Sequence, residues 1–180
     1  MKKSTSDLRE GKLGRQEFLE LPRHPLTIVL SGLKMENLGS VFRVADAALV
    51  ESLVLCGVPY TPDSLRFKKA AKGTQRWVPH STRGDLLETL SELKERGVRI
   101  YALEQATGSV PYQTAHYEFP AALVLGKERE GLDERVIEMA DGILELPMRG
   151  MGNSLNVSVA CGIVVFHMIE QWESRRDQTD

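Results

Sequence analysis

The sequence predicts an α/β fold: a mostly parallel sheet with helices on both faces. Five short apolar runs recur along the chain in the manner of buried parallel strands. Segments whose apolar residues have helical spacing separate several of these runs. Alternation of this kind is typical of a sheet whose crossovers are helices. The 180 residues, 42% of them apolar, suit one domain with a substantial core.

The elements are predicted in chain order as follows. Residues 1–25 are a charged leader with one short helix around 15–21, and residues 26–172 form the domain, followed by a polar tail at 173–180. The predicted strands are 26–30, 52–56, 98–103, 121–125 and 143–146. A helix is predicted over 38–49, and a second over 86–93 that ends at Gly97.

The final helix, predicted over about 155–172, is apolar nearly all round. A helix of that kind must be covered on more than one side. A second subunit would cover the face that one small domain leaves open, so we expect a homodimer. Burial of the helix within its own domain is the alternative.

Composition excludes several classes of protein. No stretch approaches the length of a membrane span, and the N-terminus lacks the apolar run of a secretory signal. Cys56 and Cys161 belong to no C-x-x-C pair, and the four histidines are scattered. We therefore expect a reduced, cytoplasmic protein without a metal.

A basic stretch between residues 66 and 83 contains no acidic residue. Its cations are Arg66, Lys68, Lys69, Lys72, Arg76 and Arg83. They are suited to neutralising the phosphates of a nucleic acid, and Trp77 among them offers a stacking surface. A solvated helix face with a core tryptophan is an equally good interpretation at this point.

Three polar clusters interrupt otherwise apolar segments. In the first, residues 36–40, Asn37 is a predicted N-cap of the following helix. Arg43 lies between Phe42 and Val44 on a helix that is expected to be largely buried. It either forms an ion pair with Asp46, three residues on, or holds an anion in a cleft.

The second cluster, residues 126–131, directly follows the apolar run 121–125. Open α/β sheets place ligands at such turns, at the carboxyl ends of strands. The turn matches neither the P-loop nor the dinucleotide-binding glycine pattern. Taken alone, the loop is better interpreted as an ordinary charged turn.

The third cluster, residues 147–156, joins a strand to the final helix. Ser154 is the predicted N-cap, which places Asn156 in the first turn. Gly150 and Gly152 permit backbone shapes that bring amide groups close to a ligand. Capping accounts for Ser154 without any function. It does not account for Asn156 beside an apolar helix, although hydration of that side chain would.

Taken together, the clusters resemble the SpoU/TrmH family of SPOUT RNA methyltransferases. The strings that carry the resemblance are 37–43 (NLGSVFR), 125–132 (LGKEREGL), 146–148 (LPM) and 154–160 (SLNVSVA). They occur in the family's order, and the resemblance covers roughly residues 26–172. Several motifs in order are far more specific than any one of them.

The resemblance implies a fold whose C-terminal segment is threaded into a deep trefoil knot, a homodimer, and S-adenosylmethionine as cofactor. The family grips the cofactor largely through backbone groups. Here that implies the residues Leu103, Gly126, Leu146, Met148 and Leu155.

The implied reaction is methylation of a ribose 2′-hydroxyl of RNA. Related enzymes use the residue corresponding to Arg43 to activate that hydroxyl. Because arginine stays protonated, we expect Arg43 to bind the neighbouring phosphate and to stabilise the developing alkoxide. The resemblance gives orienting roles to Asn37, Glu128, Ser154 and Asn156.

Among RNA substrates, transfer RNA is favoured. Residues 70–78 resemble tRNA-modifying members, and residues 146–160 resemble the enzymes that methylate the D-loop guanosine. Longer relatives that act on ribosomal RNA carry an N-terminal RNA-binding domain, for which residues 1–25 are too few. In either case, the stretch 66–83 would supply phosphate contacts, with Arg66, Lys68, Lys69, Lys72 and Arg76 as the expected RNA-binding residues.

Two other classes of function remain open. One is a non-catalytic RNA-binding module that retains the fold, and labelled cofactor with bulk tRNA would separate it from an enzyme. The other is a flavodoxin-like nucleotide binder, which the strand and helix alternation alone permits. It ranks last because a fold class does not fix a function.

Overall fold

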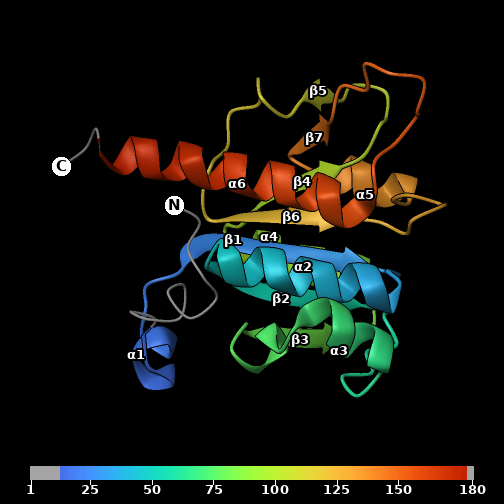
Figure 1. The fold of residues 1–180 in the computed structure, drawn as a ribbon. Helices are drawn as coiled ribbons and strands as arrows, with labels where there is room; N and C mark the ends of the chain where they lie inside the picture. The colour runs from blue at the N-terminus through green and yellow to red at the C-terminus, as the bar shows by residue number, and fades with distance from the viewer. Residues whose placement is uncertain (1–12, 178–180) are drawn as a thin grey trace.

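The computed structural model describes residues 13–177. Its centre is a seven-stranded sheet in the order β3-β2-β1-β6-β4-β7-β5 (Figure 1). Every pairing between neighbouring strands of this sheet is parallel. The strands are β1 His24–Ser31, β2 Val50–Cys56, β3 His80–Arg83, β4 Arg99–Leu103, β5 Val110–Pro111, β6 Ala121–Leu125 and β7 Gly142–Glu145.

The five apolar runs all form strands, and the predicted parallel sheet is confirmed. The sequence analysis missed β3 and β5, the two edge strands. Edge strands bury little, so they lack the apolar run that identifies a central strand. β3 is a short polar segment, and β5 consists of two residues.

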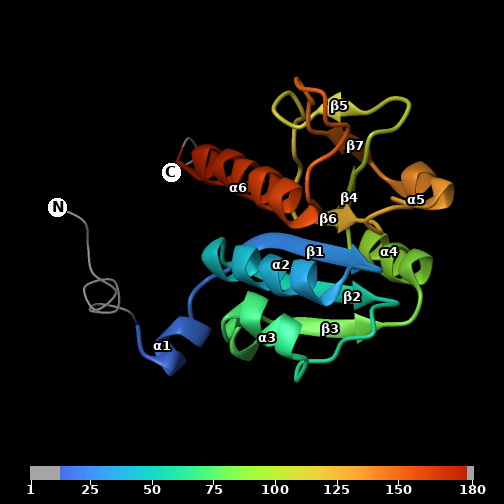
Figure 2. The same ribbon diagram turned by 45° about the vertical axis from the view of Figure 1, so that its right-hand side comes forward.

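Helices cover both faces of the sheet, as Figures 1 and 2 show. The helices are α1 Arg15–Leu19, α2 Met35–Ala47, α3 Leu65–Ala71, α4 Leu86–Glu95, α5 Glu134–Met139 and α6 Val157–Arg176, with a 3-10 turn η1 at Thr74–Arg76. α2, α3 and α6 lie on one face, and α4 and α5 on the other. The short helices α3 and α5 were not predicted, because one or two turns carry too little periodicity to recognise.

Alternate residues of the central strands belong to two apolar cores, one on each face of the sheet. In β1, Leu26, Ile28 and Leu30 belong to the core under α2 and α6, whereas Val29 belongs to the core under α4 and α5. Because successive side chains of a strand point to opposite faces, a strand covered on both sides is apolar throughout. Trp77 is partly buried against the first core, in agreement with the core interpretation of that residue.

α2 is held against α3 at Gly39. A Cβ on Gly39 would lie 2.7 Å from the Cβ of Ala70 and 2.9 Å from the backbone nitrogen of Ala71. Only glycine permits this close approach of two helices. The basic helix α3 is therefore fixed relative to the helix that carries Asn37 and Arg43.

α6 begins two residues after its predicted start and ends four residues beyond Trp172. One side packs into the domain through Cys161, Val164, Val165, Met168 and Ile169. Val159, Ile163 and Phe166 on the same helix are 50%, 37% and 51% exposed. The apolar side that the sequence analysis expected to need a cover is thus open in the single chain. Across residues 13–177, no helix has both the length and the apolar character needed to cross a membrane.

Candidate active site

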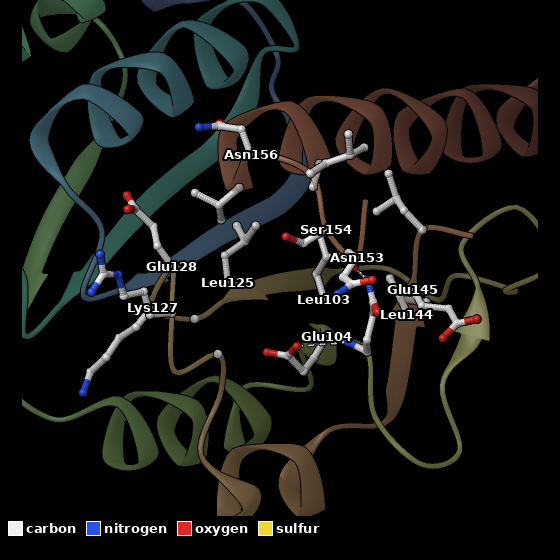
Figure 3. Close-up of a pocket in the computed structure, with 18 of the residues that line it drawn as sticks. Leu103, Glu104, Leu125, Lys127, Glu128, Leu144, Glu145, Asn153, Ser154 and Asn156 are labelled. Carbon is white, nitrogen blue, oxygen red and sulfur yellow. Dashed lines mark hydrogen bonds between the residues drawn. The ribbon is translucent and has the colours of Figure 1, made fainter. Parts of the chain in front are cut away.

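A cavity of about 430 Å³ lies where β4, β6 and β7 end. Its walls come from the loops after these strands and from the first turns of α2 and α6 (Figure 3). Parallel strands direct their carboxyl ends to one edge of the sheet, where open α/β folds bind ligands. The volume is within the usual range of sites for small molecules and cofactors.

Nine of the ten residues predicted for catalysis or cofactor binding line this cavity. They are Asn37, Leu103, Gly126, Glu128, Leu146, Met148, Ser154, Leu155 and Asn156. Residues far apart in the chain, from each of the three polar clusters, thus share one pocket. Arg43 is the exception and is described below.

The loop after β6 folds back on itself at two glycines. Lys127 and Gly131 exchange backbone hydrogen bonds of 3.1 and 2.9 Å. A Cβ on Gly126 would lie 2.4 Å from the carbonyl carbon and oxygen of Gly131. Gly131 has a φ of +68°, which disfavours a side chain there as well. The loop shape therefore depends on glycine at both positions.

A continuous hydrogen-bonded network joins the three clusters. The Glu128 carboxylate accepts 2.5 Å from Asn37 Nδ2 and pairs at 2.6 Å with Lys34 Nζ. Asn156 Nδ2 donates to Asn37 Oδ1 at 2.9 Å, and Asn156 Oδ1 accepts from the backbone N–H and hydroxyl of Ser158. Each amide has one defined orientation in this network, which fixes the relative positions of α2, α6 and the loop after β6.

Glu128 is held in its charged form. Burial opposes ionisation, but hydrogen bonds from Lys34 and Asn37 outweigh it and lower the pKa of the Glu128 carboxyl. The carboxylate accordingly serves as an acceptor that orients Asn37 at neutral pH.

Both predicted N-caps are wrong. α2 begins at Met35 after Lys34, so Asn37 lies in the first turn and directs its side chain to Glu128 and Asn156. α6 begins at Val157, and its N-cap is Asn156, whose side chain accepts from Ser158 N–H. The capping rule identified the right residue types, but it did not distinguish a cap from a side chain recruited across the pocket.

The walls of the cavity combine apolar and acidic groups. Leu125 and Leu144 are buried beneath it, and Leu103, Leu146 and Leu155 border it. Glu104, Glu128 and Glu145 contribute carboxylates. Such a lining suits a flat aromatic group together with a cationic one.

Arg43 is not among the residues that line the cavity. It lies on α2 between buried Phe42 and half-buried Val44, and its own side chain is exposed. The expectation that this position is largely buried is therefore wrong. Two consecutive residues of a helix point in directions about 100° apart, so a buried neighbour does not bury Arg43.

The basic stretch lies on α3, η1 and β3, and its six cations are exposed. Arg66 pairs with Glu36 at 3.6 Å, Lys68 with Asp63 at 2.7 Å and Arg83 with Glu92 at 3.8 Å. Within residues 13–177, Lys69, Lys72 and Arg76 form no ion pair. These three side chains present the least compensated positive charge of the stretch.

The pocket residues Glu104, Gln105 and Glu145 were not predicted, and neither was Lys34, which pairs with Glu128 of the pocket. Glu104 and Gln105 directly follow β4, so the rule that ligands bind at strand ends would have found them. Lys34 carried no comparable signal, because its role depends on Glu128, which is distant in sequence.

Metal-binding clusters and reactive thiols are two other sources of chemistry in proteins. No cluster of three histidine, cysteine or acidic side chains between residues 13 and 177 is placed to hold a metal ion. Cys56 and Cys161 are both buried as free thiols, and burial raises the pKa of each.

The sequence is similar to known RNA-modifying enzymes. A family model described as the SpoU rRNA Methylase family matches residues 25–166. A tRNA (guanosine(18)-2′-O)-methyltransferase of Thermus thermophilus is 33% identical over 157 residues, which cover 87% of this chain and 80% of that enzyme. The 23S rRNA (guanosine-2′-O-)-methyltransferase RlmB of Ralstonia nicotianae is 36% identical over 178 residues, covering 92% and 71%.

Solved structures of RNA-modifying enzymes are also similar to this chain. The TrmH/SpoU tRNA modifying enzyme of A. aeolicus superposes with a TM-score of 0.80 at 30% identity, covering 89% of this chain and 82% of that one. An AdoMet-bound rRNA methyltransferase from Sinorhizobium meliloti superposes with a TM-score of 0.75 at 27% identity, covering 85% and 59%.

Proposed function

Because the chain belongs to the SpoU rRNA Methylase family, we propose that it transfers the methyl group of S-adenosylmethionine to a ribose 2′-hydroxyl of RNA. The convergence of three sequence motifs on one cavity through the Lys34–Glu128–Asn37–Asn156 network carries this proposal. Relatives with the same activity in their names and an AdoMet-bound structural neighbour support it.

The pocket fits the cofactor. The leucines around it suit an adenine ring, and Gly126 lines the cavity at the point where its missing side chain lets the backbone of Gly131 approach closely. The carboxylates of Glu128 and Glu145 suit a cofactor that carries a sulfonium and an ammonium group. Leu103, Gly126, Leu146, Met148 and Leu155 would hold it.

Bound S-adenosylmethionine supplies a methyl group that an in-line oxygen accepts, so positioning of the acceptor is a large part of the catalysis. Asn37 and Asn156 hold the edge of the pocket in a single arrangement, and Glu128 fixes Asn37. Ser154 lies in the loop over the cavity, where its hydroxyl orients the RNA. Arg43 binds the phosphate beside the target ribose and stabilises the alkoxide that forms as the hydroxyl proton leaves.

Transfer RNA is the favoured substrate, and a guanosine of the D-loop is the favoured position. The name of the Thermus thermophilus relative specifies guanosine 18 of tRNA. The Ralstonia relative acts on 23S rRNA, which makes ribosomal RNA the second candidate. Methyl-labelled S-adenosylmethionine, incubated separately with unmodified tRNA and with ribosomal RNA, distinguishes the two. Label in neither RNA would favour the non-catalytic RNA-binding module.

The cations of α3 and η1 bind RNA phosphates in this account. Replacing Lys69, Lys72 and Arg76 together by glutamine should weaken RNA binding without changing cofactor affinity. Each phosphate contact contributes a slope of about 0.7–0.9 to the dependence of log K on log salt, so the slope should fall by roughly 2–3. Binding titrations at several salt concentrations measure it.

Arg96→Gln is the matched control, since Arg96 is exposed at the C-terminal end of α4, across the sheet. It should leave the slope unchanged. A triple variant with the wild-type slope would place the RNA on a different surface.

A homodimer through α6 is part of the proposal. Val159, Ile163 and Phe166 form an exposed apolar strip that runs from the pocket end of α6 toward its middle. The neighbouring helix α2 packs against α6, with Val44 close to Gly162. A second copy seated on the strip would lie next to α2, the helix that carries the exposed Arg43, and we infer that the guanidinium acts at a pocket of the assembled dimer.

Phe166→Glu should convert the dimer to a monomer, because it replaces the largest apolar side chain of the strip by a charge. Light scattering after size exclusion should give twice the 20.1 kDa chain mass for the wild type and a single chain mass for the variant. Leu65→Glu is the control, since Leu65 is 85% exposed on α3. A wild-type protein that is monomeric at micromolar concentration would rule out the dimer.

The trefoil knot is also a proposal. β7 enters the sheet between β4 and β5, which precede it in the chain, and the chain then continues through loop 146–156 to α6 on the face covered by α2. This late insertion between earlier strands supports threading of the C-terminal segment.

A further inference from the structure

The dipeptide Glu104-Gln105 occupies the centre of the pocket's edge. β4 lies between β6 and β7 in the sheet. The residues that follow β4 therefore lie between the loop after β6 and the loop after β7. Both Glu104 and Gln105 line the cavity, and neither belongs to the motifs described above.

Glu104 binds the loop after β6. Its Oε2 accepts from Leu132 N–H at 2.9 Å, and its Oε1 accepts from Gln105 N–H at 3.0 Å. A Cβ on Gly131 would lie 2.3 Å from Glu104 Oε2. The carboxylate therefore fills the space that glycine leaves at position 131 and fixes the end of the loop that carries Glu128.

Gln105 binds the loop after β7. Its Nε2 donates to the Asn153 carbonyl at 2.8 Å. Asn153 immediately precedes Ser154, and most of the loop from Pro147 to Leu155 is exposed. An exposed segment with little apolar contact opens at low cost, so a side-chain tether has a large influence on its shape.

We propose that Glu104 and Gln105 are positioning residues that together hold the two loops of the pocket in the shape that binds the cofactor. The proposal rests on the proposed function, because the cofactor in question is S-adenosylmethionine. Neither side chain needs to take part in the transfer itself. The two residues raise the fraction of molecules whose loops are ready to bind, and apparent affinity falls in proportion when that fraction falls.

Glu104→Gln is the sharpest test, because it keeps the shape of the side chain. One amide oxygen still accepts from one N–H, but the amide NH₂ then faces a second donor. Loss of a charge-assisted hydrogen bond predicts an increase of about tenfold or more in the dissociation constant for S-adenosylmethionine, measured by calorimetry. Gln105→Ala should raise the same constant by a smaller factor.

The rate at saturating cofactor and the KM for RNA should stay within about twofold of the wild type in both variants. A residue with a merely structural role would instead lower the melting temperature and all kinetic parameters together. Glu95→Gln, an exposed carboxylate on α4, is the matched control and should behave as wild type. A Glu104→Gln variant with wild-type affinity, or with a reduced rate at saturating cofactor, would overturn the proposal.

Amide hydrogen exchange without cofactor separates this proposal from the function on which it rests. The Leu132 N–H should exchange about tenfold faster in Glu104→Gln and faster still in Glu104→Ala. Unchanged exchange at Leu132 in both variants would refute the positioning role even if the enzyme is active. Faster exchange in a protein that binds no S-adenosylmethionine would support the loop tether and reject the proposed function.

Discussion

Gly126→Ala is expected to abolish measurable binding of S-adenosylmethionine. The added Cβ would lie 2.4 Å from the backbone carbonyl of Gly131 and 2.7 Å from the backbone nitrogen of Leu132. Backbone atoms on both sides leave no flexible side chain to move away, so the loop after β6 must shift as a whole. Overpacking of this kind also costs about 1–3 kcal/mol of stability.

Calorimetry with S-adenosylmethionine and urea unfolding measure the two effects separately. The affinity should fall by at least about a hundredfold, to a level that calorimetry no longer measures, because a misplacement of about 1 Å can have an effect of that size. Gly150→Ala, in the loop after β7, is the control, because a Cβ there meets nothing within 4 Å and Gly150 does not line the cavity. Wild-type affinity in Gly126→Ala would remove this loop from the cofactor site.

Arg43→Ala is expected to reduce turnover by about a thousandfold while leaving cofactor affinity intact. Loss of one group that stabilises developing negative charge costs about 10²–10³ in rate. Arg43 is exposed and does not line the cavity, so the cofactor site and the fold should not respond to its removal. Arg43→Lys should recover only part of the rate, since lysine cannot bind a phosphate through two parallel hydrogen bonds.

Single-turnover methylation of RNA and calorimetry with S-adenosylmethionine measure the two quantities. Arg96→Ala, on the opposite face of the sheet, should match the wild type in both. Equal losses of rate and affinity in Arg43→Ala would show that the residue supports the cofactor site instead. An unchanged rate would exclude Arg43 from the reaction.

The central sheet could be predicted from the sequence because its strands are buried on both faces. A strand such as β6, Ala121–Leu125, is apolar at every position, and its predicted bounds match the structure. The edge strand β3 is polar and exposed, so nothing distinguished it from a loop. Strands could therefore be predicted where both faces are buried, and they could not be predicted at the exposed edges of the sheet.

The pocket was predictable for a different reason. Gly126 and Leu146 directly follow strands, and parallel strands bring their carboxyl ends to one edge of the sheet. Contacts between those residues were not predictable. The pairing of Lys34 with Glu128 and of Glu104 with Leu132 depends on the order of strands in the sheet, which periodicity does not encode.

Arg43 shows the limit of reading one residue from its neighbours. Its sequence position between two apolar residues indicated burial, yet the helix turns its side chain to solvent. In the proposed dimer, the relation of Arg43 to a pocket is set by a second chain. The apolar residues of α6 can be recognised in a single sequence, and they predict an interface. The geometry across that interface cannot be recognised in the same way.

Methylation of a tRNA transcript, followed by nuclease digestion and mass spectrometry of the nucleosides, tests the central claim most directly. The wild-type protein with S-adenosylmethionine should produce 2′-O-methylguanosine in an unmodified transcript. A transcript with 2′-deoxyguanosine at the mapped position should accept no methyl group there. A methyl group found on a base, or one that persists when the 2′-oxygen is removed, would contradict the account.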